Sequence, residues 1–175
     1  MEDYRLHFAK TAAEIALFWE RRDRYMREDI LPNCSFDPPT DEDWQWFFSA
    51  EYKDHIMDIF HNGENPLEIV FLEKDGEHLG FSSFITYLNE DGKCIIIEFC
   101  VNAAYRNAGV GGIFFDLIKK HAAAIGATYF SINLSNEDNE RFWLRQGFAK
   151  SGQDEHGDDV YSYPIHVSPV PPRKT

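Results

Sequence analysis

The stretch VNAAYRNAGVGGIFF, residues 101–115, decides the fold because it places a glycine-rich turn at the start of a helical pattern. The chain has 30 Asp and Glu and a formal net charge of -13, yet Arg106 is the only charge in this stretch. Gly109, Gly111 and Gly112 let an anion approach the backbone, and the free amides and dipole of a helix N-terminus attract it. The stretch therefore predicts a phosphate-binding turn, although the glycines alone fit close packing of helix on sheet equally well.

Two other phosphate-binding motifs do not fit these glycines. A P-loop requires Gly-Lys followed by Ser or Thr at the helix start, and the chain has no such tripeptide. The dinucleotide fingerprint GxGxxG fails as well, because the run reads GxGG and no glycine follows at the last position.

The residues before this turn predict a β-meander. Residues 67–101 contain three apolar, β-rich runs separated by KDGE and NEDGK. Asp-Gly between such runs is a strong hairpin signal, because glycine accepts the positive φ of a tight turn. We therefore expect three consecutive antiparallel strands that end at the glycine turn.

The rest of the chain alternates between helical and extended patterns. Capping-box spacing at Thr11–Glu14 and at Thr40–Asp43 marks two helix starts. The expected elements outside the meander are a strand at 4–9, a helix at 12–29 in one or two pieces, a loop at 31–40, a helix at 41–60, a helix at 109–125, a strand at 127–134, a short helix at 136–146 and strands at 147–152 and 159–166.

Composition excludes several classes of protein. A length of 175 residues and 43% hydrophobic residues fit one globular domain, and the apolar runs are too short to span a membrane. The acidic balance argues against a nucleic-acid partner and is compatible with a cationic small molecule, although solubility alone also explains it. The start MEDYRLHFAK lacks the apolar core of a secretory signal, so we expect a cytoplasmic protein.

Cysteine and histidine spacing give no sign of a disulfide framework or a metal site. Cys34, Cys94 and Cys100 are odd in number and lack CxxC spacing, which favours reduced thiols. There is no HExxH pair, and His55 and His61 are six residues apart, so they lie on different faces of a helix. We expect no bound metal.

The segment Arg106-x-x-Gly109-x-Gly111 resembles the acyl-CoA pyrophosphate loop of the GNAT N-acetyltransferase superfamily, whose pattern is Arg/Gln-x-x-Gly-x-Gly/Ala. Further on, SNEDNERFWLRQGF is similar to the family's Asn-x6-Tyr-x3-Gly-Phe segment. Asn136, Gly147 and Phe148 match that segment, and Trp143 replaces its tyrosine. A basic residue commonly precedes the first glycine of the loop, and a proline often stands near its start; this chain has Ala108 and Ala103 there.

The resemblance implies an α/β (α+β) fold with a mixed, mostly antiparallel seven-stranded sheet, a splayed fourth and fifth strand pair and flanking helices. It covers residues 1–166 as one N-acetyltransferase domain, followed by a Pro-rich tail at 167–175. It implies an acetyl-CoA-dependent N-acetyltransferase acting on a primary amine of a small molecule or peptide. The alternative is a catalytically weak CoA-binding regulatory or sensor module. The acceptor, the acyl length and the oligomeric state stay open, with a homodimer among the alternatives.

The family's coenzyme-binding positions carry over residue by residue. Pantetheine would pair with the exposed backbone at the end of the fourth strand, and the pyrophosphate would bind the glycine loop. The residues concerned are Phe99, Cys100, Val101, Arg106, Asn107, Ala108, Gly109, Val110, Gly111, Gly112, Asn136, Asn139 and Trp143.

Glu98 is the candidate general base, because it is the only carboxylate within CIIIEFCV and burial would raise its pKa. It could instead face solvent or simply bind the substrate cation. The Cys100 amide could polarise the thioester carbonyl, whereas its thiol has no identifiable base partner and fits a core cysteine better. Trp19, Tyr25 and Glu98 are the candidate substrate-binding residues. Trp143 cannot give up its proton, so another group or solvent must protonate the leaving thiolate.

Overall fold

The structure is a computed structural model that describes residues 3–165, so the Pro-rich tail expected at 167–175 lies outside the described residues. Its centre is a seven-stranded sheet with the order β1-β2-β3-β4-β5-β7-β6. Every neighbouring pair is antiparallel except β4 and β5, which are parallel. The expected fold class is therefore confirmed. The strands are β1 Arg5–Phe8, β2 Leu67–Lys74, β3 Glu77–Thr86, β4 Lys93–Val101, β5 Tyr129–Ile132, β6 Ala149–Gln153 and β7 Asp159–Pro164.

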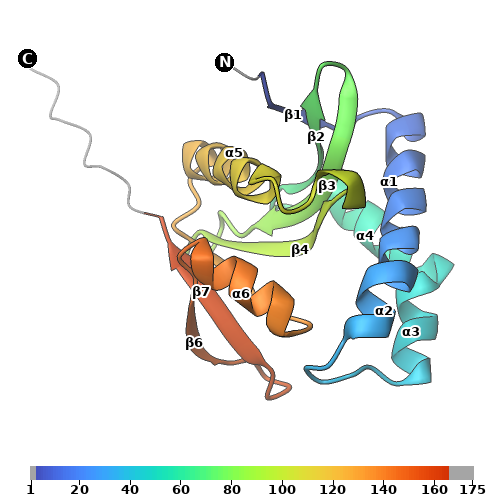
Figure 1. Cartoon of the computed structure of the whole chain (residues 1–175), viewed down its shortest axis with the longest axis vertical. Coiled ribbons are helices and arrows are strands. Elements are labelled where there is room, and N and C mark those ends of the chain that lie inside the picture. The colour runs from blue at the N-terminus through green and yellow to red at the C-terminus, as the bar shows by residue number, and fades with distance from the viewer. Residues whose placement is uncertain (1–2, 166–175) are drawn as a thin grey trace, which may run out of the picture.

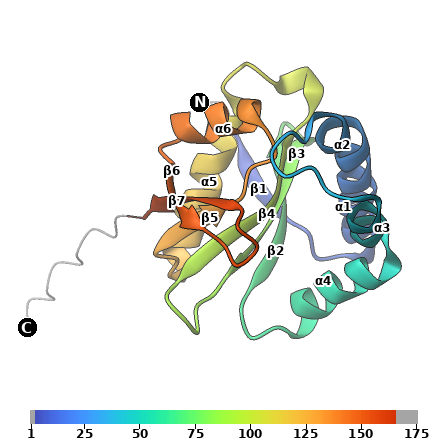
Figure 2. The same ribbon diagram turned by 90° about the horizontal axis from the view of Figure 1, so that it is seen from below.

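Helices cover both faces of this sheet (Figures 1 and 2). The first four lie on one face, and α5 and α6 lie on the other. The helices are α1 Ala12–Tyr25, α2 Leu31–Asn33, α3 Asp41–Phe48, α4 Ala50–Asn62, α5 Val110–Ile125 and α6 Glu137–Arg145, with a π-helical turn at Met26–Ile30 and a 3₁₀ turn at Ala103–Tyr105.

Both predicted capping boxes are present. Thr11 Oγ1 accepts from the Glu14 amide, while Glu14 Oε2 accepts from the Thr11 amide at 2.9 Å. The same reciprocal pair joins Thr40 and Asp43. These bonds satisfy amides that the first helical turn leaves free, which explains why α1 and α3 begin where the sequence indicates.

Two helical predictions need correction. The helix expected at 41–60 is divided at Ser49, whose extended backbone ends α3 and whose Oγ accepts from the Tyr52 amide to begin α4. The loop expected at 31–40 begins later, because the helical run from Ala12 continues through the π-helical turn and α2 to Asn33. A π-helical turn shifts the helix surface by one residue and is common at functional sites.

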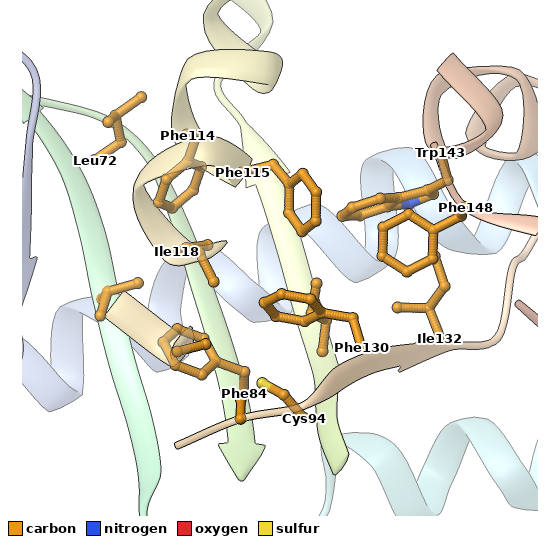
Figure 3. Packing of buried hydrophobic residues seen from close by; sticks show 14 of the residues in the cluster. Leu72, Phe84, Cys94, Phe114, Phe115, Ile118, Phe130, Ile132, Trp143 and Phe148 are labelled. Carbon is orange, nitrogen blue, oxygen red and sulfur yellow. The ribbon is translucent and has the colours of Figure 1, made fainter. Parts of the chain in front are cut away.

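The sheet separates two apolar cores. One lies under α5 and α6 and is rich in aromatic rings, including Phe114, Phe115, Phe130, Trp143 and Phe148 (Figure 3). The other lies under α1 and α4 and includes Phe18, Phe71, Phe81 and Cys100. Burial on both faces explains why β2 reads as a nearly continuous apolar run. β3 is buried from Leu79 to Thr86, although that stretch includes two serines.

The parallel strands β4 and β5 pair over a short length only. Lys93, Cys94 and Ile95 pair with Tyr129, Phe130 and Ser131. Beyond Ile95 no residue of β4 pairs with a residue of β5, although β4 continues to Val101. The splay expected from the resemblance is therefore present, and it leaves one edge of β4 without a strand partner.

A β-bulge in β4 changes which face its side chains occupy. Phe84 pairs with Ile96 and Ser83 pairs with Glu98, so Ile97 is the extra residue. Before the bulge, even-numbered residues of β4 such as Ile96 belong to the α5 side, and after it the odd-numbered Phe99 and Val101 do. The bulge therefore turns Glu98 and Cys100 toward the α1 side.

Candidate active site

Two adjoining cavities lie at the splay. The larger cavity, of ≈ 870 Å³, is bordered by the end of β4, the loop at 106–112, α6 and the π-helical turn. The smaller cavity, of ≈ 290 Å³, lies between the separated arms of β4 and β5. The two cavities share one wall, formed by Tyr25, Ile30, Phe99, Asn139 and Phe142.

The glycine turn forms one wall of the larger cavity. Asn107 and Gly109 have positive φ values of 60 and 78, and α5 begins directly afterwards without a side-chain cap. Gly109, Gly111 and Gly112 all line the cavity. A Cβ on Gly111 would lie 2.9 Å from Phe142 Cε2, so this glycine also permits close packing against α6. Anion approach and close packing thus use the same turn.

Arg106 is anchored at the mouth of this turn. Its Nε donates to the Val101 carbonyl at 2.7 Å, and its Nη2 donates to Asp29 Oδ2 at 2.6 Å. Hydrogen bonding to Asp29 raises the pKa of Arg106. Asp29, from the π-helical turn, thus brings a carboxylate to a loop whose own sequence has none. Arg141 and Arg145 on α6 also line this cavity, and Asp138 of the same lining pairs with Arg141.

Glu98 lies in the wall of the smaller cavity and is paired with a buried arginine. Glu98 Oε1 accepts from Arg22 Nε at 3.0 Å, and the residues are 9% and 1% exposed. Glu98 therefore does not face bulk solvent. Burial raises the pKa of Glu98 above its ordinary value, and the Arg22 guanidinium opposes this shift. The prediction that burial raises the pKa of Glu98 is therefore confirmed.

Arg22 is held by more than Glu98. It donates to Asp23 Oδ1 at 3.2 Å and to the Phe47 carbonyl, and its guanidinium lies 5.0 Å from the Tyr52 ring centroid. Lys53 pairs with Asp23 on the other side. Two cations and two carboxylates therefore balance within this network. Arg22 lies on the same helix face as the apolar Phe18. In the sequence, this position on an apolar face was the one feature that could have indicated a buried, paired arginine.

Burial also decides the chemistry of Cys100 and Tyr25. It raises the pKa of the Cys100 thiol to about 12, so the thiol is not ionised at neutral pH. This argues against Cys100 as a nucleophile. The expected role of its backbone amide needs correction too, because the Cys100 carbonyl faces Gly80 of β3 and the Asn102 amide donates to the Leu79 carbonyl at 2.8 Å. Alternation along β4 therefore directs the Cys100 amide toward β3 and the Phe99 and Val101 amides toward the open edge. Burial raises the pKa of Tyr25 well above its ordinary value, and Tyr25 lines both cavities.

The remaining expected site residues fall into two groups. Asn136 caps α6, with Oδ1 accepting from the Asn139 amide at 2.9 Å, and both line the larger cavity. Trp143 is 6% exposed, packs on Phe115 and Phe148 and lines the smaller cavity only (Figure 3). Those that line neither cavity are Trp19, Ala108 and Val110.

The sequence profile of the Acetyltransferase (GNAT) family matches residues 36–148. The chain belongs to the GNAT acetyltransferase family. No curated protein is significantly similar to this GNAT protein in sequence. Within residues 3–165, no helix combines the length and the apolar character that crossing a membrane requires.

Solved structures of other GNAT proteins share the fold. A GNAT-family acetyltransferase from Desulfovibrio desulfuricans is 14% identical, with a TM-score of 0.65 over 94% of this chain and 100% of that one. GCN5 from Tetrahymena is 16% identical, with a TM-score of 0.63 over 94% and 96%. The PaiA N-acetyltransferase from Thermoplasma acidophilum, solved with coenzyme A, is 14% identical, with a TM-score of 0.60 over 91% and 98%.

Proposed function

We propose that this GNAT protein transfers the acetyl group of acetyl-CoA to a primary amine of a small molecule or peptide, with Glu98 as the general base. The observation that carries the proposal is a buried carboxylate in the wall of the smaller cavity, beside the cavity of the glycine turn. Membership of the family supports acyl transfer. A cytoplasmic location and a homodimer stay predictions from the sequence.

The larger cavity fits a CoA thioester in size and charge. Its ≈ 870 Å³ and its three arginines, Arg106, Arg141 and Arg145, suit a long, polyanionic molecule. The helix start at Val110 offers free amides to a pyrophosphate. The open edge of β4 at Phe99–Val101 suits an amide-containing pantetheine arm, which would add as a short strand. Bound acetyl-CoA supplies the thioester carbonyl that the amine attacks.

The smaller cavity suits an acceptor amine. Phe47, Tyr52 and Phe142 give it aromatic walls, and Glu98 gives it a carboxylate. Aromatic faces and a carboxylate together favour a cation over a neutral or anionic group. The volume of ≈ 290 Å³ favours a small acceptor or a single inserted side chain or N-terminus.

The residues can move the protons that the reaction requires. An amine is protonated at neutral pH, so Glu98 accepts one ammonium proton, directly or through water, and frees the nitrogen lone pair. Arg22 favours the ionised form of this buried carboxylate by opposing the rise in its pKa that burial causes. The amides of Phe99 and Val101, at the open edge of β4, are the candidate donors to the carbonyl oxygen as negative charge develops there. Tyr25 remains a protonated phenol and is a candidate donor to the leaving thiolate, which solvent can also protonate.

Replacement of Glu98 by Gln tests the proposal. We expect kcat for thiol release, measured with a panel of polyamines, amino sugars and N-terminal peptides, to fall by about a hundredfold or more. The Kd for CoA from calorimetry should stay near the wild-type value. Glu20→Gln, on the exposed side of α1, is the matched control. Wild-type kcat and an unchanged pH profile in Glu98→Gln would show that Glu98 is not the base.

The sensor alternative has one specific observation in its favour. The indole of Trp143 occupies the family's tyrosine position within an aromatic core, where it offers no acidic proton. If wild-type protein binds CoA tightly and acetylates none of the amines, the sensor function is favoured. Turnover of any amine that depends on Glu98 favours the enzyme.

A further inference from the structure

A cluster of histidine and glutamate side chains lies outside both cavities, at the β1 edge of the sheet. His7 on β1, Glu73 on β2 and His78 on β3 bring their ligand atoms within 4.8 Å of one another. The strand register explains the cluster, because Glu73 pairs with His78, while His7 pairs with Phe71, two residues before Glu73 on the same strand face. None of these residues lines either cavity.

The ligand atoms of this cluster lie close enough together to surround one ion. Glu14 is a carboxylate that only accepts, so His7 Nε2, at 2.6 Å from Glu14 Oε1, carries the hydrogen. In the neutral ring, Nδ1 then bears a lone pair, and it lies 3.3 Å from Glu73 Oε2. His78 Nε2 lies 4.0 Å from the same oxygen. Acceptors at this distance are bridged by a proton or by a metal cation.

We propose that His7 Nδ1, Glu73 Oε2 and His78 Nε2 form a binding site for a divalent transition metal, with Zn²⁺ as the expected ion. Zn²⁺ takes imidazole nitrogen and carboxylate oxygen at about 2.0–2.2 Å, which places tetrahedral ligands roughly 3.3–3.5 Å apart. The distances of 3.3 and 4.0 Å to Glu73 Oε2 reach that spacing after small side-chain rotations. Water completes the fourth position of such a site.

The surrounding residues orient the ligands as a metal site requires. Glu14 fixes the tautomer and ring plane of His7, which is the carboxylate–histidine–metal arrangement of many zinc sites. Arg5 binds Oε1 of Glu73 and leaves Oε2 toward the two histidines. His78 is stacked on Phe71, with ring centroids 4.4 Å apart and planes inclined by 6°. The carboxylates of Glu14 and Glu73 offset the positive charge of Arg5 and of Arg21, whose guanidinium lies 5.5 Å from the Phe71 ring centroid.

The position of the site indicates a structural role. Its ligands come from three adjacent strands, and the supporting carboxylate comes from the first turn of α1. β1 is a four-residue edge strand, which is the least secured part of a sheet. A metal there would fasten β1 and the start of α1 to the meander. The spacing of the histidines in the sequence does not indicate this site, because the three ligands are neighbours only across adjacent strands.

The experiment uses the full chain without a histidine tag and titrates it with Zn²⁺ by calorimetry, with Mg²⁺ as a comparison that prefers oxygen ligands. We expect one Zn²⁺ per chain, no Mg²⁺ binding and a higher Tm with Zn²⁺. His7→Gln and His78→Gln should each weaken Zn²⁺ binding by at least tenfold. His55→Gln, an exposed histidine on α4, should leave it unchanged.

A further variant covers the case in which a ligand replacement disturbs folding. Glu14→Gln keeps a residue that capping boxes accept, so α1 should form normally. It removes the carboxylate behind His7 and should weaken Zn²⁺ affinity by about tenfold or more. Absence of Zn²⁺ binding to the wild-type chain overturns the proposal and leaves a proton between His7 and Glu73. Equal Zn²⁺ affinity in wild type, Glu14→Gln and His78→Gln overturns it as well, because the ion then binds elsewhere.

Discussion

The pairing of Arg22 with Glu98 makes a quantitative prediction for Arg22→Met. Methionine fills a similar volume but leaves the Glu98 carboxylate buried without its cation, and it removes the donor to the Phe47 carbonyl. Removing one partner of a buried ion pair typically costs about 3–5 kcal/mol, because the remaining charge stays desolvated. For a chain of this length, that corresponds to a fall in Tm of about 6–20 °C.

The pH dependence of this loss follows from Glu98. Its folded pKa is already raised by burial, and loss of Arg22 raises it further. A raised folded pKa penalises the ionised form, so stability is lost as the pH rises through that pKa. Below the unfolded pKa the carboxyl group is neutral in both states. The difference in unfolding free energy between wild type and Arg22→Met should therefore be largest at neutral pH and smaller in acid.

Urea unfolding at several pH values measures this difference, and a double variant isolates its cause. Arg22→Met combined with Glu98→Gln removes both charges, so it should recover much of the stability that Arg22→Met alone loses. Arg24→Met is the matched control, because its pair with Glu20 is exposed and should contribute about 0.5 kcal/mol or less. A loss below about 1 kcal/mol for Arg22→Met, or no recovery in the double variant, would refute the reasoning.

Two further predictions concern the larger cavity. Gly111→Asp should weaken CoA binding in calorimetry by at least tenfold, about 1.4 kcal/mol, through charge repulsion. Gly111→Ala adds only the contact with Phe142 and should cost less, so equal losses in both variants would point to packing alone. Asp29→Asn frees Arg106 and removes a negative charge from the lining, so CoA should bind a few-fold more tightly. Weaker CoA binding in Asp29→Asn would mean that the Asp29 carboxylate positions Arg106 productively.

The sequence predicts those parts of the fold that depend on local chemistry. Thr11 and Thr40 begin helices because their caps are formed within four residues. The division at Ser49 was missed because a serine that follows two phenylalanines reads as part of one amphipathic helix. The π-helical turn was missed for a similar reason, since its residues have ordinary helical propensities.

The candidate site depends more on contacts between distant residues. Arg106 and Asp29 are 77 positions apart, so the sequence of the glycine loop could not indicate this carboxylate. The direction of Glu98 depends on the bulge at Ile97, which a continuous apolar run conceals. The run predicted a buried carboxylate, but its partner Arg22 lies on another element, 76 positions away.

The bulge at Ile97 also decides how the length of β4 relates to function in a related sequence. Ser83 pairs with Glu98 and Phe84 with Ile96, so a chain that lacks Ile97 would have a regular ladder and would keep Glu98 on the side of Arg22. A chain that keeps this residue but forms no bulge would turn Glu98 toward the α5 side, although every catalytic side chain would still be present. A one-residue gap at this position is therefore compatible with activity, whereas a strand of unchanged length with regular alternation carries the charge on the wrong face of the sheet.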